Sequence, residues 1–458
     1  MKIQFKKRNA GGISQRVSSQ SAVRHRVKRR WRASGLLLLA SIVMLVAGCG
    51  ESAPNTKPPV NGENGSGQIQ EEPKGKITFW NQQRKGTNFM NSESLPENYE
   101  AAKERYIEFI RLAPDKWAKD RDFLFNDQPD SKPNRDFLIG NADQYEGLVE
   151  EDFAKLKGDL DAAEARGSKV VLTVLSLPGD RWRQFNNKKN DDRIWEDETY
   201  HEQAALFWRD LASRLKDHPA VIGYNLINEP HPETATGFHD FWTEDYAEWY
   251  KGVEGTAADL NKLYDTIVKA IRTVDSDTPI ILNSGLYATP WAFQYLKPVQ
   301  DDNVLYAFHM YEPYELTSQN KKKGLAIEYP GKVKVGEQQT EKEFNKETLK
   351  QFLEPVAKWA AEHNVPANRI IAEEFGINRM VTGADQYLAD LISIFNEYGW
   401  HWAFYAFRED TWDGMDYEMG DKKPNWKYWE AIEKGEQPPR IEIDSPMWDA
   451  LKEGLDKQ

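Results

Sequence analysis

The segment GYNLINEPHPE, Gly223–Glu233, runs from mostly apolar residues directly into a group of polar ones. Its apolar part belongs to AVIGYNLIN, residues 220–228, which has the length and composition of a buried β-strand. Such a strand ends by delivering Asn228 and the carboxylate of Glu229 to the rim of a sheet. The segment therefore predicts a chemically useful edge, and it raises the question of where a partner for Glu229 lies.

Seven further apolar runs of the same kind follow or precede this strand, which makes eight candidate strands. They are GTNFM (86–90), YIEFIRL (106–112), KVVLTVLSL (169–177), PIILNSG (279–285), NVLYAFHMY (303–311), RIIAEEFG (369–376) and WHWAFYAF (400–407). Segments with an apolar stripe at helical spacing lie between them, and we expect helices at 145–165, 201–217, 258–274, 346–363 and 385–398.

Eight strands alternating with helices predict an α/β protein with a parallel sheet closed into a (β/α)8 TIM barrel. No repeat or second linker interrupts residues 77–458, so we interpret this range as a single domain. ITFWNQQ, Ile77–Gln83, precedes the first strand, and we expect it to form part of a hairpin that plugs the bottom of the barrel.

In a barrel of this type the active site lies at the carboxyl ends of the strands. Two carboxylates, Glu229 and Glu374, are expected there at the ends of the fourth and seventh strands. Arg111, Asn228, His309 and Tyr311 are expected to lie between them. Glu373 is the rival of Glu374, and because neighbours on a strand point to opposite faces, only one of the two is expected to face the barrel interior.

A pair of carboxylates suits cleavage of a glycosidic bond. One carboxyl group protonates the leaving oxygen, and an ionised one attacks or stabilises the anomeric carbon. Arg111 beside one of them would keep that carboxylate charged. The sequence does not say which carboxylate Arg111 contacts.

Four motifs in chain order, FIRL (109–112), NEP (228–230), FHMY (308–311) and EEFG (373–376), resemble glycoside hydrolase family 5. The resemblance covers residues 77 to about 435 and implies a retaining (β/α)8 hydrolase. It implies that Glu229 is the acid/base and Glu374 the nucleophile. It also implies that Asn228 binds the sugar 2-hydroxyl, that Arg111 and Tyr311 hold the nucleophile, and that His309 is a site histidine.

Two positions depart from the family pattern. TVLSLPG stands where many cellulases have DLHGAPG, so Leu175 occupies the position of an expected site histidine. This difference leaves specificity for cellulose open. The eighth strand offers Tyr405 in place of the usual Trp as a stacking face, with Trp402 and Phe407 as the alternatives for another register.

Several loop residues could touch sugars or simply pack the loops. Trp182, Trp195, Trp291 and Trp412 follow strands, and either role fits them. His231 and Glu233 are interpreted as loop residues that could contact a distal sugar. TWDGMDYEMG, with Asp413 and Asp416, lacks the complete ligand pattern of a calcium loop, so it is interpreted as a sugar-binding or lid loop.

The first 49 residues combine a basic segment with the apolar run LLLLASIVMLVAG (36–48), as in a secretory signal. The run ends in VAGC, which resembles a bacterial lipobox, and Cys49 is the single cysteine of the chain. Residues 1–49 therefore predict a lipoprotein signal peptide with lipidation at Cys49, and a buried free thiol is the alternative. Residues 50–76 are polar and rich in Pro and Gly, so we expect a flexible linker.

The leader holds eleven of the 60 basic residues and none of the 73 acidic ones, so the remainder carries a net charge near −24. Such a charge disfavours nucleic acid and polyanionic substrates and favours a neutral glycan. We expect a monomeric, lipid-anchored extracytoplasmic enzyme that needs no metal or organic cofactor.

A cellulase-like endo-β-glucanase is the preferred activity among β-linked neutral glycans. A mannanase, a β-1,3-glucanase, an exo-β-glucanase or glucosidase, and a glycosylceramidase remain open as alternatives. The alternative from another class is a surface lipoprotein that binds glycan without cutting it.

Overall fold

The computed structural model describes part of the chain beyond Lys74. The described residues are 75–117, 135–141, 143–183, 186, 189–239, 243, 245–318, 328–335, 340–410, 413–433, 436 and 439–456. The expected lipidation site Cys49, residues 50–74 of the expected linker and Trp412 lie outside them. Within these described ranges, no helix is both long and apolar enough to cross a membrane.

Eight parallel strands form a closed barrel, which confirms the predicted fold. Each strand pairs with its neighbours in chain order, and the last strand pairs with the first. The barrel strands are β1 (Lys85–Phe89), β2 (Phe109–Leu112), β5 (Val170–Thr173), β8 (Val221–Asn225), β9 (Ile280–Asn283), β10 (Val304–Met310), β13 (Ile370–Phe375) and β14 (His401–Phe404). All eight lie within, or within one residue of, the segments predicted from the sequence.

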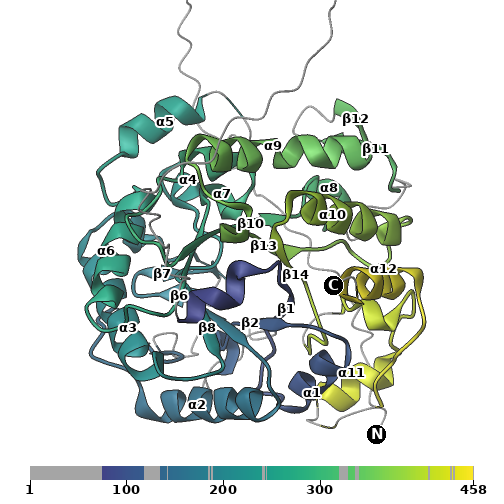
Figure 1. Ribbon diagram of the computed structural model, residues 1–458, viewed down its shortest axis with the longest axis horizontal. Helices are drawn as coiled ribbons and strands as arrows, with labels where there is room; N and C mark the ends of the chain where they lie inside the picture. Colours follow the sequence, from purple (N-terminus) through teal and green to yellow (C-terminus); the bar gives the residue numbers. More distant parts are fainter. Residues whose placement is uncertain are drawn as a thin grey trace, which may run out of the picture. The chain divides into compact units, whose positions relative to one another are not determined.

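Helices surround the strands, as Figure 1 shows for α2, α3, α6, α9 and α10. The longer helices are α1 (Glu97–Glu104), α2 (Glu150–Ala165), α3 (Thr199–Leu215), α5 (Tyr246–Val253), α6 (Leu260–Arg272), α9 (Lys346–Glu362), α10 (Ala384–Tyr398), α11 (Trp426–Glu433) and α12 (Pro446–Asp456). Asp259 and Asn345 begin α6 and α9 by accepting hydrogen bonds from backbone N–H groups of the first turn. The five helices predicted from the sequence correspond to α2, α3, α6, α9 and α10.

Short elements lie in the connections. The strand pairs are β3 (Arg135–Asp136) with β4 (Gly140–Asn141), β6 (Ser176–Leu177) with β7 (Asp180–Arg181), and β11 (Gly331–Val335) with β12 (Thr340–Phe344). The short helices are α4 (Pro232–Ala235), α7 (Gly285–Ala288) and α8 (Tyr314–Thr317), with 3-10 turns at Lys76–Asn81, Asp115–Trp117, Arg193–Trp195, Trp291–Tyr295, Ala367–Arg369 and Tyr417–Met419.

Side chains from the strands and from the segment that precedes β1 close the barrel interior at the amino-terminal end of the strands. That segment, Lys76–Asn81, is a 3-10 helix, so the expected hairpin is wrong, although the expected plug is present. Trp80 is fully buried, donates to the carbonyl of Ile222 at 3.0 Å and packs against Phe109. Gly86 faces the same layer, where a Cβ atom would lie 2.6 Å from the Phe109 ring.

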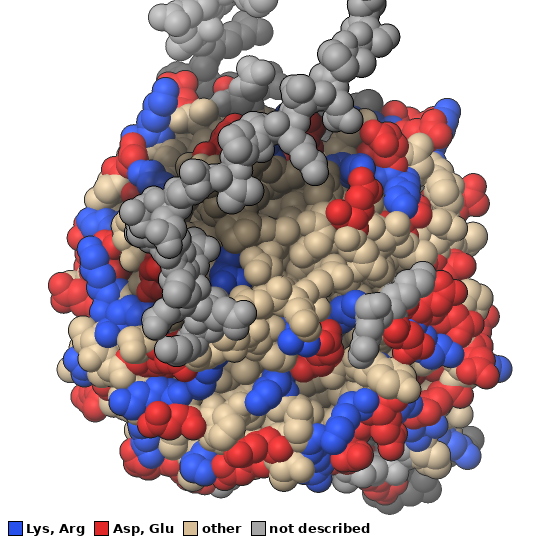
Figure 2. All heavy atoms as spheres, viewed as in Figure 1, with Lys and Arg blue, Asp and Glu red and all other residues tan. Residues whose placement is uncertain are grey.

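A larger apolar cluster fills the space between the strands and the helices, and it includes Trp208, Trp359 and Trp402. The two apolar layers hold the strands rigidly from both faces, which is the support that a catalytic site at the strand ends needs. Figure 2 shows one face of the molecule with a hollow near its centre, uncharged residues around the hollow and charged side chains toward the margin.

Candidate active site

Arg111 is the centre of a buried polar network at the carboxyl ends of the strands. It lies on β2 and is fully buried. Its Nη1 donates to Oε1 of Glu374 at 2.5 Å, and its Nη2 donates to Oδ1 of Asn228 at 2.7 Å. The carboxylate that Arg111 holds most closely is therefore that of Glu374, a choice that the sequence left open.

A layer of asparagines below this network was missed by the sequence reasoning. Asn88 and Asn225 accept hydrogen bonds from Arg111 at 3.1 and 2.8 Å. Asn225 also donates to Asn283, which donates to the Glu373 carboxylate. The signal was an Asn near the carboxyl end of each of β1, β8 and β9, because a buried amide in an apolar strand requires partners.

Glu373 and Glu374 both reach the barrel interior, so the expectation that only one of them faces inward is wrong. The pairing of β10 with β13 shifts by one residue here, with Phe308 opposite Ala372 and His309 opposite Glu374. This β-bulge places an extra residue on β13 and breaks the alternation of side chains. Glu373 is 0% exposed and lies deeper, 3.4 Å from Nε of Arg111.

His309 connects the three carboxylates. Its Nδ1 lies 2.9 Å from Oε1 of Glu229 and 3.6 Å from Oε2 of Glu374, and its Nε2 lies 3.5 Å from Oε1 of Glu373. Although burial by itself would lower the pKa of His309, the carboxylates raise that pKa to about 9. His309 is therefore an imidazolium at neutral pH and a second buried cation beside Arg111.

Glu374 has a second fixed donor in Tyr311, whose hydroxyl donates to Oε2 at 2.8 Å. Burial raises the pKa of Glu374, and the positive charges of His309 and Arg111 oppose that rise. For Glu373 the opposing charges of Arg111 and His309 outweigh burial and lower the pKa. Both carboxylates of the bulge are thus held by cations, but only Glu374 lies toward the mouth, where it keeps a small exposed fraction.

Glu229 stands at the open side of the network. Its side chain is 23% exposed, and its backbone has φ of 51°, a left-handed conformation that is uncommon for a residue other than glycine. Such strained positions concentrate at functional sites because the surrounding structure has to impose them. Oxygen atoms of Glu229 and Glu374 lie within 4.8 Å of one another.

Asn228 lies between Arg111 and the mouth. Its Oδ1 accepts from Arg111, and its backbone N–H donates to Val174 at 3.1 Å. The amide nitrogen is then the end of the side chain that is available as a donor to a ligand hydroxyl.

An apolar patch borders the network on one side, formed by Met90, Ala113 and Leu175 with Trp182 and Tyr405 packed against it. Leu175 is buried in this patch, so the position where the family pattern places a histidine is apolar here. Tyr405 donates its hydroxyl to Glu409 at 2.6 Å, which fixes the ring at the end of β14. Trp402 and Phe407, the alternatives for Tyr405, are buried in the outer core.

Of the other aromatic candidates, two pack within the protein and one lies at the mouth of the barrel. Trp195 is buried in the core, and Trp291 packs edge-on against Tyr246. Trp182 lies at the mouth, with ring centroids 5.0 Å from His231 and 5.5 Å from Tyr287.

The structure also bears on the predictions for two loops, the one after Glu229 and the one that contains Asp413 and Asp416. His231 and Glu233 are each 1% exposed, so the expected contact with a distal sugar is wrong for both. In the TWDGMDYEMG loop, Asp413 forms an ion pair with Arg379, and Asp416 forms one with Arg440 at 2.6 Å. These two aspartates are thus engaged in holding the loop.

The side chains of Glu229, His309 and Glu374 are close enough together to hold a metal ion. However, His309 bonds to Glu229, and both oxygens of Glu374 accept hydrogen bonds from Arg111 and Tyr311. We interpret the group as an ion-paired carboxylate site.

The cellulase model of glycosyl hydrolase family 5 matches residues 81–411 of the chain, well over half of its length. This chain belongs to glycosyl hydrolase family 5. Endoglucanase C of Acetivibrio thermocellus is similar to it, with 24% identity over 314 residues, 63% of this chain and 82% of that protein. An endoglycoceramidase of Cyanea nozakii is 34% identical over 119 residues, 24% of this chain and 21% of that protein.

Solved structures show the same fold. A structure described as a glycoside hydrolase superimposes with a TM-score of 0.56 at 18% identity, covering 81% of this chain and 99% of that one. This family 5 protein is accordingly a glycoside hydrolase that acts on O-glycosyl bonds.

His309 gives a testable pH dependence of stability in this family 5 hydrolase. Because its pKa in the folded protein, about 9, lies above the ordinary value of about 6.5, the native state binds the proton more tightly than the unfolded chain. The stabilisation is therefore complete below about pH 6.5 and is lost as the pH rises through about 9. We expect a loss of about 3 kcal/mol across this window.

The measurement compares the free energy of urea unfolding of the parent and of His309→Gln at several pH values. The difference between the two proteins should shrink from pH 6.5 to pH 9, because the variant lacks this proton. A difference that stays constant across the window would show that His309 is neutral in the folded protein.

Proposed function

We propose that this hydrolase cleaves β-linked neutral glycans with retention of configuration, with Glu374 as nucleophile and Glu229 as acid/base. The observation that carries the proposal is the approach of the two carboxyl groups to within 4.8 Å between oxygen atoms. Retaining enzymes hold the pair about 5–5.5 Å apart, whereas inverting enzymes need about 6.5–9.5 Å to admit a water molecule.

The charges of the network support these roles. Arg111 and His309 provide two positive charges against the three carboxyl groups of Glu229, Glu373 and Glu374. A single proton on one carboxyl group makes the network neutral. Arg111 and Tyr311 both donate to Glu374, which suits a nucleophile, and Glu373 lies deeper with a lowered pKa. Glu229, at the open side of the network, is therefore the carboxyl group that we assign to proton transfer.

In the first step, Glu374 attacks the anomeric carbon while Glu229 gives its proton to the leaving oxygen. The Glu374–sugar ester forms and the glycosidic bond breaks. In the second step, Glu229 takes a proton from water, the water oxygen attacks the anomeric carbon, and Glu374 leaves as a carboxylate. The amide nitrogen of Asn228 is positioned to donate to the sugar 2-hydroxyl.

Proton NMR of the first-formed product tests the mechanism. We expect the β-anomer of the new reducing end to appear first from a β-glucan and to equilibrate later with the α-anomer. Initial appearance of the α-anomer would contradict both the mechanism and the role of Glu374.

For the substrate, we propose an endo-acting β-glucanase. The similarity to Endoglucanase C, which covers 63% of this chain and 82% of that protein, supports this activity. A glycosylceramidase is the second candidate, because the apolar patch of Met90, Ala113 and Leu175 borders the carboxylates and because the endoglycoceramidases match a limited stretch at higher identity.

Activity on β-glucan, cellopentaose, β-mannan and a glycosylceramide tests these candidates, with the length of the products measured for each substrate. Mid-chain cleavage of β-glucan is expected; release of an intact oligosaccharide from ceramide alone would select the second candidate.

We also propose that the chain is an extracytoplasmic lipoprotein anchored at Cys49 to a bacterial membrane, at the cell surface or the periplasmic face, with the catalytic domain acting as a monomer. The leader and the VAGC motif support this proposal. In a bacterial host, labelled palmitate should enter the full chain and not Cys49→Ser, and the variant should leave the membrane fraction. Equal labelling of both proteins would exclude Cys49 as the acceptor.

A further inference from the structure

A second cluster of two carboxylates and an imidazole lies beside the active site and takes no part in the proposed reaction. Asp180 is on β7, Asp192 precedes the 3-10 turn Arg193–Trp195, and His231 follows the NEP segment. One potential ligand atom from each residue lies within 4.8 Å of the other two. The cluster therefore joins the loop after β5 to the loop that carries Glu229.

The polar atoms of this cluster lack the hydrogen bonds that buried groups normally make. Asp180 and His231 are each 1% exposed. Oδ1 of Asp180, Oδ1 of Asp192 and Nε2 of His231 are all buried without a hydrogen-bond partner. Nε2 of His231 lies 3.4 Å from Oδ1 of Asp192. Apart from this ion pair the three atoms have no partner, and unsatisfied buried atoms are rare in native proteins, so the cluster has room for an additional ligand.

The other ring nitrogen of His231 is already occupied. Nδ1 lies 3.2 Å from the carbonyl oxygen of Glu229, and an N–H on Nδ1 can donate there, while Nε2 lies 3.4 Å from Oδ1 of Asp192. Metal-binding histidines almost always have this arrangement, in which the second nitrogen donates to a carbonyl or carboxylate. The ring is also held flat against Tyr287, with centroids 5.1 Å apart.

Arginines of the same loop are engaged elsewhere. Arg181 pairs with Asp136, and Arg193 pairs with Asp143 and Asp191. Among the described residues, no Lys or Arg forms an ion pair with Asp180 or Asp192. The two carboxylates of Asp180 and Asp192 therefore have a single imidazole beside them. A buried group of this composition favours an added positive charge.

We propose that Asp180, Asp192 and His231 bind a divalent transition-metal ion of the zinc type. One nitrogen and two carboxylate oxygens match the ligands of three-residue zinc sites, in which water supplies the fourth position. Bonds of about 2.0–2.1 Å at tetrahedral angles separate neighbouring ligand atoms by about 3.3–3.5 Å, and the His231–Asp192 distance is 3.4 Å. The ion has a structural role: it fixes His231 and, through the Glu229 carbonyl, the backbone of the residue that we assign as acid/base.

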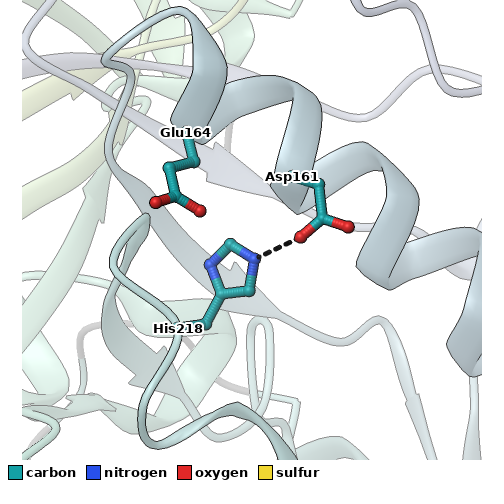
Figure 3. Close-up of side chains that lie close together, drawn as sticks. All are labelled: Asp161, Glu164 and His218. Atoms are coloured by element: carbon teal, nitrogen blue, oxygen red, sulfur yellow. Dashed lines mark hydrogen bonds and ion pairs between the residues drawn. The ribbon is translucent and has the colours of Figure 1, made fainter.

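A second acid–histidine cluster provides a matched control. Figure 3 shows Asp161 and Glu164 of α2 with their carboxylates toward His218. Asp161 is half exposed and already accepts from Lys157 at 2.7 Å and from His218 at 3.2 Å. Its atoms have partners in protein and solvent, so we expect it to bind metal far more weakly.

The test uses the full chain, stripped with EDTA and dialysed against ZnCl2, MnCl2 or CaCl2 in turn, with bound metal and the unfolding midpoint measured. We expect one equivalent of zinc and a rise of a few degrees in the midpoint, since a ligand that binds only the native state stabilises it. His231→Gln and Asp192→Asn should lose both effects, and His218→Gln should keep them.

Cobalt(II) added to the stripped parent gives a readout that needs no variant. A four-coordinate site should produce intense visible absorption, and zinc should displace it. No stoichiometric metal, binding that survives in His231→Gln and Asp192→Asn, or binding lost in His218→Gln would each overturn the proposal. None of these measurements depends on the reaction that the enzyme catalyses.

Discussion

Glu374→Ala should reduce the hydrolysis of β-glucan by at least about 10⁴-fold, because the substitution removes the group that forms the covalent intermediate. The fold should persist, since Arg111 keeps its contacts with Asn88, Asn225, Asn228 and Glu373. Circular dichroism and the unfolding midpoint check the fold, and steady-state kinetics check the rate.

Azide distinguishes a lost nucleophile from a damaged site. In Glu374→Ala the truncated side chain leaves room for a small anion beside Arg111 and Tyr311. With 2,4-dinitrophenyl β-cellobioside, azide should attack the anomeric carbon from the vacated side and displace dinitrophenolate. The product should be the α-glycosyl azide, which NMR identifies.

Glu373 supplies the matched control for this experiment. Glu373→Ala vacates the neighbouring carboxylate in the same way but keeps Glu374, so azide should give no α-glycosyl azide. If Glu374→Ala hydrolyses β-glucan at the parent rate, or if the azide product appears with Glu373→Ala alone, the nucleophile is Glu373.

The strands could be predicted because apolar runs of strand length recur along the chain with amphipathic helices between them. AVIGYNLIN and NVLYAFHMY are buried on both faces, which is how parallel strands are recognised. Their carboxyl ends meet in any closed parallel barrel, so Arg111, Glu229, His309 and Glu374 could be placed together from topology alone.

The bulge at Glu373–Glu374 could not be predicted in this way. Alternation of side chains is the rule for a regular strand, and a one-residue shift against β10 depends on three-dimensional pairing that EEFG does not encode locally. The consequence is chemical, because the shift adds a third carboxylate to the network. It explains why two cations, Arg111 and His309, are buried there.

Burial of His231 and Glu233 was also beyond a local reading. Prolines and polar residues after a strand are typical of an exposed loop. Here the Glu233 carboxylate accepts from the buried hydroxyl of Tyr246, and His231 stacks on Tyr287, whose backbone has a φ of 62°. Both contacts are with residues distant in sequence.

Glu229→Gln should show an effect that depends on the leaving group, which separates an acid/base from a residue that only supports the site. Hydrolysis of unactivated β-glucan should fall by about 10³–10⁴-fold, because the leaving oxygen requires protonation. Dinitrophenolate needs no proton, so its release from the cellobioside in the first turnover should stay near the parent rate. The glycosyl-enzyme should then accumulate, because the general base for water is missing.

A stopped-flow burst of dinitrophenolate equal to the enzyme concentration would report this accumulation, and mass spectrometry would locate the sugar on Glu374. Azide should restore turnover and give the β-glycosyl azide, the opposite anomer to that from Glu374→Ala, since it now attacks the ester from the side of Glu229. Glu233→Gln is the control, because it removes a buried carboxylate on the same loop without touching the network around Arg111. Equal losses for both leaving groups in Glu229→Gln would mean that Glu229 supports the site and another residue transfers the proton.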